Sequence, residues 1–226
     1  MKMHTCLGLL AIGLMAGAGA FAQDTGWGVV GKVGTEGIGA DVHRALVPRI
    51  LNLRVGASFF RYSADITDKD IDYSGKLKLG AVPVVLDVYP FKNWFRLGGG
   101  IFVNLNEVNG TARPRQGLIT INGHSYSTDQ IGQMYATVKF NRAAPYFGLG
   151  FSNPIRQGKR WGFYFDLGAM YHGHPTAALT TTRTPVAQLQ IDLNQQTQRF
   201  NSDARRFSVF PIIQFGISYH FGKRGR

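Results

Sequence analysis

The chain has 226 residues, 44% of them hydrophobic, and its 25 Lys and Arg against 13 Asp and Glu give a formal net charge of +12. Its single cysteine, Cys6, excludes an internal disulfide and a cysteine-rich metal site. No segment after Ala22 approaches about 18 uninterrupted apolar residues, which excludes a transmembrane helix.

The N-terminal segment has the features of a secretory signal peptide. Lys2 precedes an apolar run over 7–15, and Ala20-Phe21-Ala22 is a small-x-small cleavage site. We therefore predict a signal peptide over residues 1–22 and one mature domain over 23–226. So basic a chain would ordinarily suggest nucleic-acid binding. An exported protein does not meet nucleic acid, so we expect no such partner.

Eight alternating, glycine-rich segments follow, with no linker between them. They cover approximately 27–34, 37–45, 50–65, 75–89, 94–109, 131–152, 160–175 and 206–221. The break near Thr35-Glu36-Gly37 is chosen because bacterial single-chain barrels have even strand numbers. An exported chain without a membrane helix can span a bilayer only as a closed barrel. The predicted fold is therefore an all-β, eight-stranded antiparallel up-and-down transmembrane β-barrel of the bacterial outer membrane.

The connections between these strands differ in length at the two ends of the barrel. Those at one end are short and cover 46–49, 90–93 and 154–159. Those at the other end are long and cover 66–74, 110–130 and 176–205. Small outer-membrane barrels have short periplasmic turns and longer outer loops, so the first end is predicted to be periplasmic.

Aromatic residues gather at the predicted periplasmic end. They are Trp27, Trp94, Trp161, Tyr219 and Phe221. Tryptophan and tyrosine are enriched at membrane interfaces, so we predict an aromatic girdle there. The alternative is that the tryptophans fill a soluble core.

Two predicted strands change phase midway. In each of these strands, basic residues have the same parity as apolar, lipid-facing residues farther along the strand. These basic residues are Lys76, Lys78 and Lys139. Proline is tolerated in a sheet at bulges, so we predict one bulge near Pro83 and another near Pro145.

The last outer loop contains a helix signal. Thr184-Pro185 combines a capping hydroxyl with proline in the first turn. Four apolar residues and one threonine then recur at helical spacing. They are Val186, Leu189, Leu193, Thr197 and Phe200. We predict one short amphipathic helix that covers the barrel mouth or lies on lipopolysaccharide. The alternative is a frayed polar loop.

The final strand carries the clearest membrane pattern. Every second residue from Phe207 to Phe221 is apolar, whereas Gln214, Ser218 and His220 lie on the other face. Strands of soluble sandwiches alternate as well. The length of this strand exceeds the nine to eleven or so residues that a membrane strand needs, and its aromatic end favours the membrane.

Charged residues of both signs fall on the predicted inward face. They are Lys32, Asp41, Arg54, Asp87, Arg96 and Asp166. Their signs balance, buried charges must pair, and an eight-stranded barrel is only wide enough for side chains. We therefore predict a packed, ion-paired plug. The alternative is a gated conduit whose salt bridges exchange partners.

Basic residues also cluster at the predicted strand ends. The clusters are Arg113 and Arg115; Arg156, Lys159 and Arg160; Arg199, Arg205 and Arg206; and Lys223, Arg224 and Arg226. Such positions suit the anionic headgroups of outer-membrane lipid and lipopolysaccharide. A solvated rim that aids solubility is the alternative.

Few residues suggest chemistry. His172 and His174 form an H-x-H pair on one predicted strand face, but a metal site needs further converging donors, so we expect hydrogen-bonding lumen histidines and no metal. Ser125 beside His124 does not supply the geometry of a nucleophile and base. We expect no catalytic residue and no cofactor.

Several segments resemble a known family. The segments GVVGKVGTEGIGADV, VVLDVYPF, APYFGLGF, FYFDLGAMYHG and VFPIIQFGISYHF resemble small outer-membrane barrel proteins of the opacity-protein-like and outer membrane protein W-like kind. The resemblance implies an architecture, since this fold hosts adhesins, small hydrophobic-compound channels and lipid A enzymes. It also implies handling by the barrel-assembly machinery. In many relatives the terminal aromatic residue ends the chain, whereas here 222–226 follow Phe221.

These observations together predict a monomeric, non-enzymatic barrel that contributes to envelope structure or surface interaction. One alternative is a narrow channel for small hydrophobic solutes, against which Arg54, Arg96 and Asp166 argue. The other is a lipid A-modifying enzyme with chemistry near His124 or His172.

Overall fold

The structure, a computed structural model, describes residues 26–68, 71–114, 118–152, 160–183 and 186–221. The predicted signal peptide, Thr184-Pro185 and the tail 222–226 lie outside these ranges. The strands within them are β1 (Trp27–Gly34), β2 (Gly37–Val47), β3 (Leu51–Asp68), β4 (Ile71–Val88), β5 (Phe95–Asn104), β6 (Glu107–Pro114), β7 (Leu118–Ile121), β8 (His124–Ser127), β9 (Met134–Lys139), β10 (Ala143–Phe151), β11 (Trp161–Tyr171), β12 (Thr176–Thr181) and β13 (Val209–Phe221). The helices are α2 (Thr128–Ile131) and α3 (Ala187–Ala204). The all-β prediction is confirmed.

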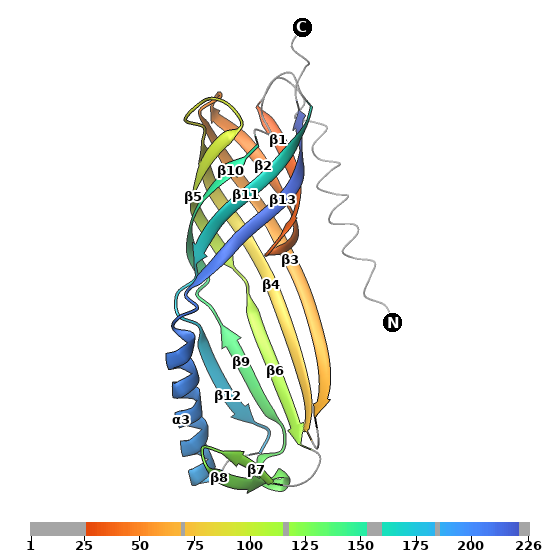
Figure 1. Ribbon diagram of the computed structural model, residues 1–226, viewed down its shortest axis with the longest axis vertical. Coiled ribbons are helices and arrows are strands. Elements are labelled where there is room, and N and C mark those ends of the chain that lie inside the picture. Colours follow the sequence, from red (N-terminus) through yellow and green to blue (C-terminus); the bar gives the residue numbers. More distant parts are fainter. Residues whose placement is uncertain (1–25, 69–70, 115–117, 153–159, 184–185, 222–226) are drawn as a thin grey trace.

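Eight of these strands form a closed, hydrogen-bonded ring. From β4 the neighbours run β3, β2, β1, β13, β11, β10 and β5, and β5 pairs back with β4. Every pair in the ring is antiparallel. The ring occupies the upper half of Figure 1. Because the sheet closes on itself, these strands have no free edge at this level.

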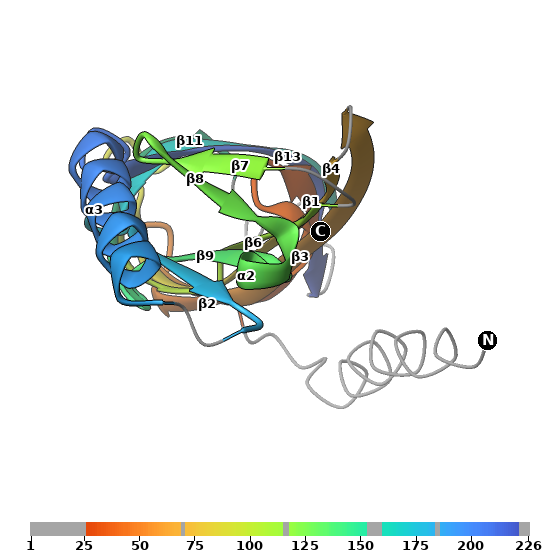
Figure 2. The ribbon, with the colours of Figure 1, turned by 90° about the horizontal axis from the view of Figure 1, so that it is seen from below.

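β3 and β4 run far beyond the ring, where three further strands join them. β6 pairs with β4, β9 pairs with β6, and β12 pairs with β9. This sheet lies below the ring in Figure 1, with α3 along its side. Figure 2 looks onto its far end, which β7, β8 and α2 cross. We call this part of the molecule, from the far halves of β3 and β4 to β6–β9, β12, α2 and α3, the extension.

The extension corrects the predicted boundaries. The expected loop 66–74 belongs mainly to the paired ends of β3 and β4. The predicted strand 94–109 is divided into β5 and β6, and 131–152 into β9 and β10. The expected loops 110–130 and 176–205 contain β7, β8, β12 and both helices. The predicted total of eight strands is therefore too low, because the pattern that guided it applies only to the ring.

The two predicted bulges are wrong. β4 keeps one register against β3 and β5 on both sides of Pro83, and β10 keeps one register against β5 on both sides of Pro145. Among the described ring pairs, the register shifts between Ala45 and Val47 in β2. Lys139 ends β9, which is a separate strand from β10.

What changes along β4 is its surroundings. Its outward face carries the exposed Val84 in the ring but the exposed Lys76 and Lys78 in the extension. Its inward face carries the buried Asp87 in the ring but Tyr73 in the extension. The strand therefore continues in one register while the polarity of its two faces inverts at the edge of the ring.

Helix α3 confirms the predicted helix but not its short length, since it spans 18 residues. Its apolar side packs against the β7–β8 hairpin and α2. The residues of this core are Ile121, Tyr126, Ile131, Leu189 and Leu193. The helix is therefore part of the extension and does not lie across the ring. In the part of the chain that the structure describes, no helix is long and apolar enough to cross a membrane.

Candidate functional site in the lumen of the ring

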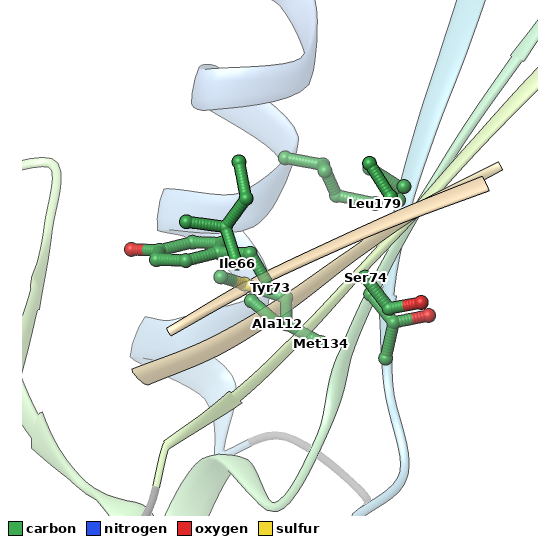
Figure 3. A pocket seen from close by; sticks show the side chains of 11 residues that line it. Ile66, Tyr73, Ser74, Ala112, Met134 and Leu179 are labelled. Atoms are coloured by element: carbon green, nitrogen blue, oxygen red, sulfur yellow. The ribbon is translucent and has the colours of Figure 1, made fainter. Parts of the chain in front are cut away.

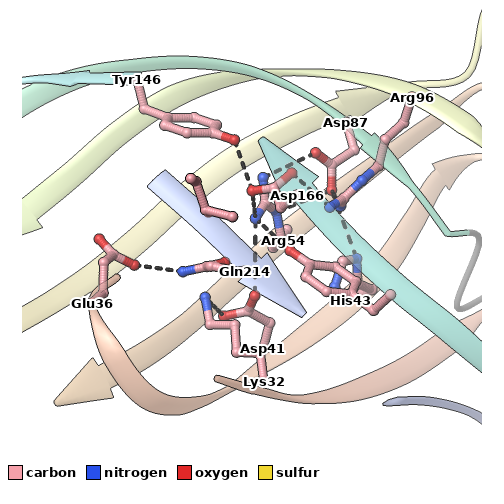
Figure 4. Close-up of polar contacts among 12 residues, drawn as sticks. Lys32, Glu36, Asp41, His43, Arg54, Asp87, Arg96, Tyr146, Asp166 and Gln214 are labelled. Atoms are coloured by element: carbon pink, nitrogen blue, oxygen red, sulfur yellow. Dashed lines mark hydrogen bonds and ion pairs between the residues drawn. The ribbon is translucent and has the colours of Figure 1, made fainter. Parts of the chain in front are cut away.

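Six charged side chains meet inside the ring, one from each of β1, β2, β3, β4, β5 and β11 (Figure 4). They are Lys32, Asp41, Arg54, Asp87, Arg96 and Asp166, and each is at most 4% exposed. These are the six residues that the sequence pattern selected. Strand alternation brings them to one face, since successive side chains of a strand point to opposite faces.

Arg96 lies between two carboxylates from different strands. Its Nη1 is 2.9 Å from Oδ2 of Asp87, and its Nη2 is 2.8 Å from Oδ1 of Asp166. Its guanidinium carbon is 4.5 Å from the ring centroid of Tyr164. The planar guanidinium thus joins two walls of the ring by charge-assisted hydrogen bonds.

Arg54 connects all three aspartates. Its Nε is 3.1 Å from Oδ2 of Asp87, and its Nη1 is 3.1 Å from Oδ2 of Asp166. The same Nη1 is 3.9 Å from Oδ2 of Asp41, whose other oxygen is 2.8 Å from Nζ of Lys32. Three carboxylates and three cations therefore form one continuous set of ion pairs, which compensates charges that water does not reach.

Two tyrosines that the sequence analysis did not select complete this network. Tyr146 donates a hydrogen bond from its hydroxyl to Asp166 at 2.7 Å. Arg54 donates to the hydroxyl of Tyr164 at 2.9 Å. The inward parity of both tyrosines in their strands was the available signal. Charge balance alone does not reveal these residues, because a neutral hydroxyl adds nothing to that balance.

A second polar group lies toward the turn between β1 and β2. Gln214 donates a hydrogen bond to Glu36 at 2.7 Å, and both side chains are buried. His43 lies on the other side of the ion pairs, toward the girdle end of β2, and is fully buried with its Nδ1 3.8 Å from Asp87. Glu36 and His43 extend the polar layer beyond the predicted six residues.

Glycines make the room that the charged side chains occupy. A Cβ at Gly150 would lie 2.4 Å from Nε of Arg96, and one at Gly56 would lie 2.0 Å from Oδ1 of Asp41. Real Cβ atoms do not approach other atoms so closely. These positions must therefore stay glycine for the network to fit.

An apolar layer fills the ring next to the charges, on the side of the extension. It consists of Ala81, Val85, Phe102, Ala144, Tyr146, Met170 and Ile212, with Phe210 packed against it. Phe102, Met170 and Ile212 are fully buried. The lumen is thus filled by two successive layers, one ionic and one apolar, and neither presents an exposed reactive group.

The predicted aromatic girdle lies at the end of the ring opposite the extension. In the strand register Trp27 is paired with Phe221 and Trp161 with Tyr219. The rings of Trp161 and Tyr219 are 4.9 Å apart. Trp94 precedes β5 at the same end and is 54% exposed.

The inner face of the extension holds an apolar pocket of about 400 Å³ (Figure 3). Its lining includes Ile66, Tyr73, Ala112, Met134 and Leu179. The two packed layers of the ring separate it from the end that carries the girdle.

A cluster that we call the latch joins the β7–β8 hairpin to α3. Tyr126 donates a hydrogen bond to the buried Asp192, and His124 and Asn122 contact the same carboxylate at 2.9 and 3.3 Å. The hydrogen bond from Tyr126 is the main reason that the pKa of Asp192 lies below its usual value. Burial and then the neighbouring carboxylate raise the pKa of Tyr126 to about 12.

The predicted histidine pair is not on a strand. β11 ends at Tyr171, and Gly173 between the two histidines adopts a positive φ of 69°. His172 is buried against Phe140, with ring centroids 4.6 Å apart, whereas His174 is exposed. Among the described residues, no three His, Cys, Asp or Glu side chains converge as a metal site would require.

Comparison with solved structures shows a similar fold in two proteins of Acinetobacter baumannii. CarO2 is 21% identical, with a TM-score of 0.55, over 85% of this chain and 97% of its own. CarO is 20% identical, with a TM-score of 0.54, over 85% of this chain and 96% of its own. No family model and no curated protein matches the chain. At this level of identity the likeness carries the fold alone.

Proposed function

We propose that the protein is an integral β-barrel of the bacterial outer membrane, with a closed lumen and a non-enzymatic role in envelope structure or surface interaction. The observation that carries this proposal is the outward face of the ring. Large apolar side chains there are exposed all round the ring, among them Val33, Ile38, Phe59, Val84, Ile101, Phe147, Phe163 and Phe215. The similarity in fold to CarO and CarO2 agrees with it.

A soluble monomer does not account for this surface. Phe163 is 73% exposed and Phe147 is 68% exposed. Exposed apolar patches on soluble monomers rarely exceed a few hundred Å², and this face encircles the molecule. Hydrocarbon is the solvent that such a face requires, and a closed ring satisfies the backbone polar groups there.

The filled lumen favours a structural role over conduction. Arg54, Arg96 and Asp166 cross the middle of the ring, and Phe102 and Met170 fill the next layer. A solute would have to break ion pairs and displace packed side chains. We therefore propose that the lumen is plugged. The same hypothesis includes a monomeric state and membership of the opacity-like and outer membrane protein W-like families.

Two measurements test this proposal. The membrane-extracted protein should require detergent for solubility, and unboiled samples should migrate differently from boiled samples on a denaturing gel. Proteoliposomes that contain it should take up small solutes no faster than barrel-free vesicles. A processed chain that dissolves in buffer without detergent contradicts the membrane proposal, and rapid uptake contradicts the plug.

The apolar pocket of the extension supports a second candidate, a narrow path for small hydrophobic solutes. Figure 3 shows its lining side chains around an apolar space. Such a path would have to continue through the apolar layer and then the charged layer. Uptake of a hydrophobic dye that requires the protein would favour this candidate.

We also propose that the chain does not modify lipid A. Ser125 lies 3.3 Å from Thr120, and the neighbouring His124 contacts Asp192 instead. Neither residue therefore supplies the pair of nucleophile and base that acyl chemistry needs. Lipid A from cells that overexpress the protein should keep an unchanged mass spectrum.

A further inference from the structure

Basic side chains from three strands of the extension, β3, β4 and β9, line up next to the ring, with β6 between β4 and β9. In the strand register Arg61 on β3 is opposite Lys78 on β4, which is opposite Glu107 on β6, which is opposite Lys139 on β9. Directly opposed residues of antiparallel strands share one face of the sheet. Lys76 follows on the same face, two residues beyond Lys78. We call Arg61, Lys76, Lys78 and Lys139 the basic row.

The basic row borders the apolar belt. Phe59, which is 55% exposed, precedes Arg61 by two residues on the same face of β3. On β4 the outward Val82 and Val84 lie on the ring side of Lys78. With a rise of about 3.3 Å per residue, Arg61 lies about 7 Å beyond Phe59 along the strand. With the proposed membrane location, its depth is that of the headgroups, just outside the hydrocarbon.

The positive charge of the row is only partly neutralised. Lys78 contacts Glu107 at 3.6 Å. The other three basic residues make no ion pair with any residue that the structure describes. The four cations of the row and the carboxylate of Glu107 have a net charge of +3, and Asp65 is a further carboxylate farther out on the same face of β3. Hydrogen bonding from Asn109 and then the charges of Lys78 and Lys139 lower the pKa of Glu107, which agrees with a positive surface.

We propose that the basic row binds the phosphate groups of lipid A in the outer leaflet, an inference that rests on the proposed membrane location. Phosphates at the border of the hydrocarbon complement cations at the same depth. Four adjacent strands cover a width of about 14 Å, at about 4.8 Å between neighbours, so the row can contact more than one phosphate. The opposite edge of the ring carries the aromatic girdle instead and faces the other leaflet.

The test uses the mature chain in phosphatidylcholine nanodiscs that contain bisphosphorylated lipid A. Binding to lipid A is measured by native mass spectrometry. The variant changes Arg61→Gln, Lys76→Gln, Lys78→Gln and Lys139→Gln together. Each basic residue near an anionic surface strengthens binding about fivefold, so we expect the affinity to fall at least about tenfold. Glu107→Gln, which removes the carboxylate that contacts Lys78, should strengthen binding.

A matched control removes four basic residues at the other end of the ring, with Arg44→Gln, Arg49→Gln, Lys92→Gln and Arg160→Gln, and should keep the affinity. Dephosphorylated lipid A should bind weakly to every variant. Any of three results would overturn the inference. The control and the row variant could lose the same affinity for lipid A, the protein could bind phosphatidylglycerol as tightly as lipid A, or the row variant could keep the affinity of the unchanged protein.

The outcome is separable from the membrane proposal. If the row variant fails to assemble, Lys76→Arg, Lys78→Arg and Lys139→Arg together keep the charge and should keep binding, while Glu107→Gln still gives the sign of the effect. Heat-dependent gel mobility reports the barrel in every variant. An intact barrel without lipid A preference contradicts only the inference, whereas a detergent-independent soluble chain contradicts the membrane proposal itself.

Discussion

The ion-paired lumen makes a prediction that separates a plug from a water-filled pore. Asp166 is the best position to test, since it is 1% exposed and contacts both Arg54 and Arg96. Asp166→Asn keeps the shape of the side chain and removes its charge. Two buried guanidinium groups then share the two remaining aspartates of the network, Asp41 and Asp87.

The size of the effect follows from these contacts. Asp166 accepts hydrogen bonds from Arg96 at 2.8 Å, from Arg54 at 3.1 Å and from Tyr146 at 2.7 Å. Breaking a buried ion pair by removing one partner costs about 3–5 kcal/mol. A pair exposed to water contributes about 1 kcal/mol or less. The packed lumen therefore predicts a loss of about 3–5 kcal/mol in the free energy of unfolding.

Urea unfolding of the protein in lipid vesicles measures this loss. Tryptophan fluorescence reports the ring, because Trp27, Trp94 and Trp161 all lie at its girdle end, and the gel mobility shift provides a second signal. Asp65→Asn, on the exposed outer face of the extension, is the matched control and should change stability by less than about 0.5 kcal/mol.

A double variant checks that the loss comes from the pair. Arg96→Met combined with Asp166→Asn removes one charge of each sign. Its cost should be smaller than the sum of the two single costs by about 2 kcal/mol or more. A loss below about 1 kcal/mol for Asp166→Asn, or strictly additive costs, would show that water screens these charges and would refute the plug.

The lowered pKa of Asp192 and the raised pKa of Tyr126, about 12, mean that the latch is stable between their unfolded values, about 4 and about 10. The stability that the latch contributes should disappear as the pH falls through the folded pKa of Asp192 and as the pH rises toward 12. Hydrogen exchange of the amides of β7 and β8 would measure both losses, and Tyr126→Phe should abolish the loss at high pH. The Gly110→Val variant should assemble normally and keep the gel shift, because a Cβ there first meets Ala136 at 3.7 Å. The Gly216→Val variant should lose the gel shift, because its Cβ would lie 2.2 Å from the carbonyl oxygen of Gly31. Val84→Lys, in the middle of the belt, should cost about 2–4 kcal/mol of stability, whereas Ser74→Lys on the same face of β4 beyond the ring should cost almost nothing; equal costs would contradict the proposed position of the membrane.

The ring could be predicted from the sequence because its strands repeat one rule. Alternation with period two selects the lumen face, and six buried charges of balanced sign on that face must pair with one another. Arg54 and Arg96 were therefore identified without a structure. The glycines that make room for Asp41 and Arg96 were not, because the need for Gly56 and Gly150 arises only from side chains on neighbouring strands.

The extension could not be predicted because there the same rule gives the opposite answer. Lys76 and Lys78 on the outward face of β4 looked like a loss of register, and Pro83 offered a bulge to explain it. The surroundings of β4 change at the edge of the ring, whereas its register against β3 stays the same. The H-x-H pair failed for a local reason, since Gly173 turns the chain where the alternation was assumed to continue.

The inversion on β4 contains information that alternation alone does not. A period of two states that the faces of a strand differ, but it does not state which solvent each face meets. When an uninterrupted strand exchanges polarity between its faces, the point of exchange marks where the solvent changes, here between Lys78 and Val82. The basic row lies near that point on three strands, β3, β4 and β9. One boundary therefore explains three observations: the misleading phase change, the apolar inner face of the extension, and the uncompensated cations at its border with the ring.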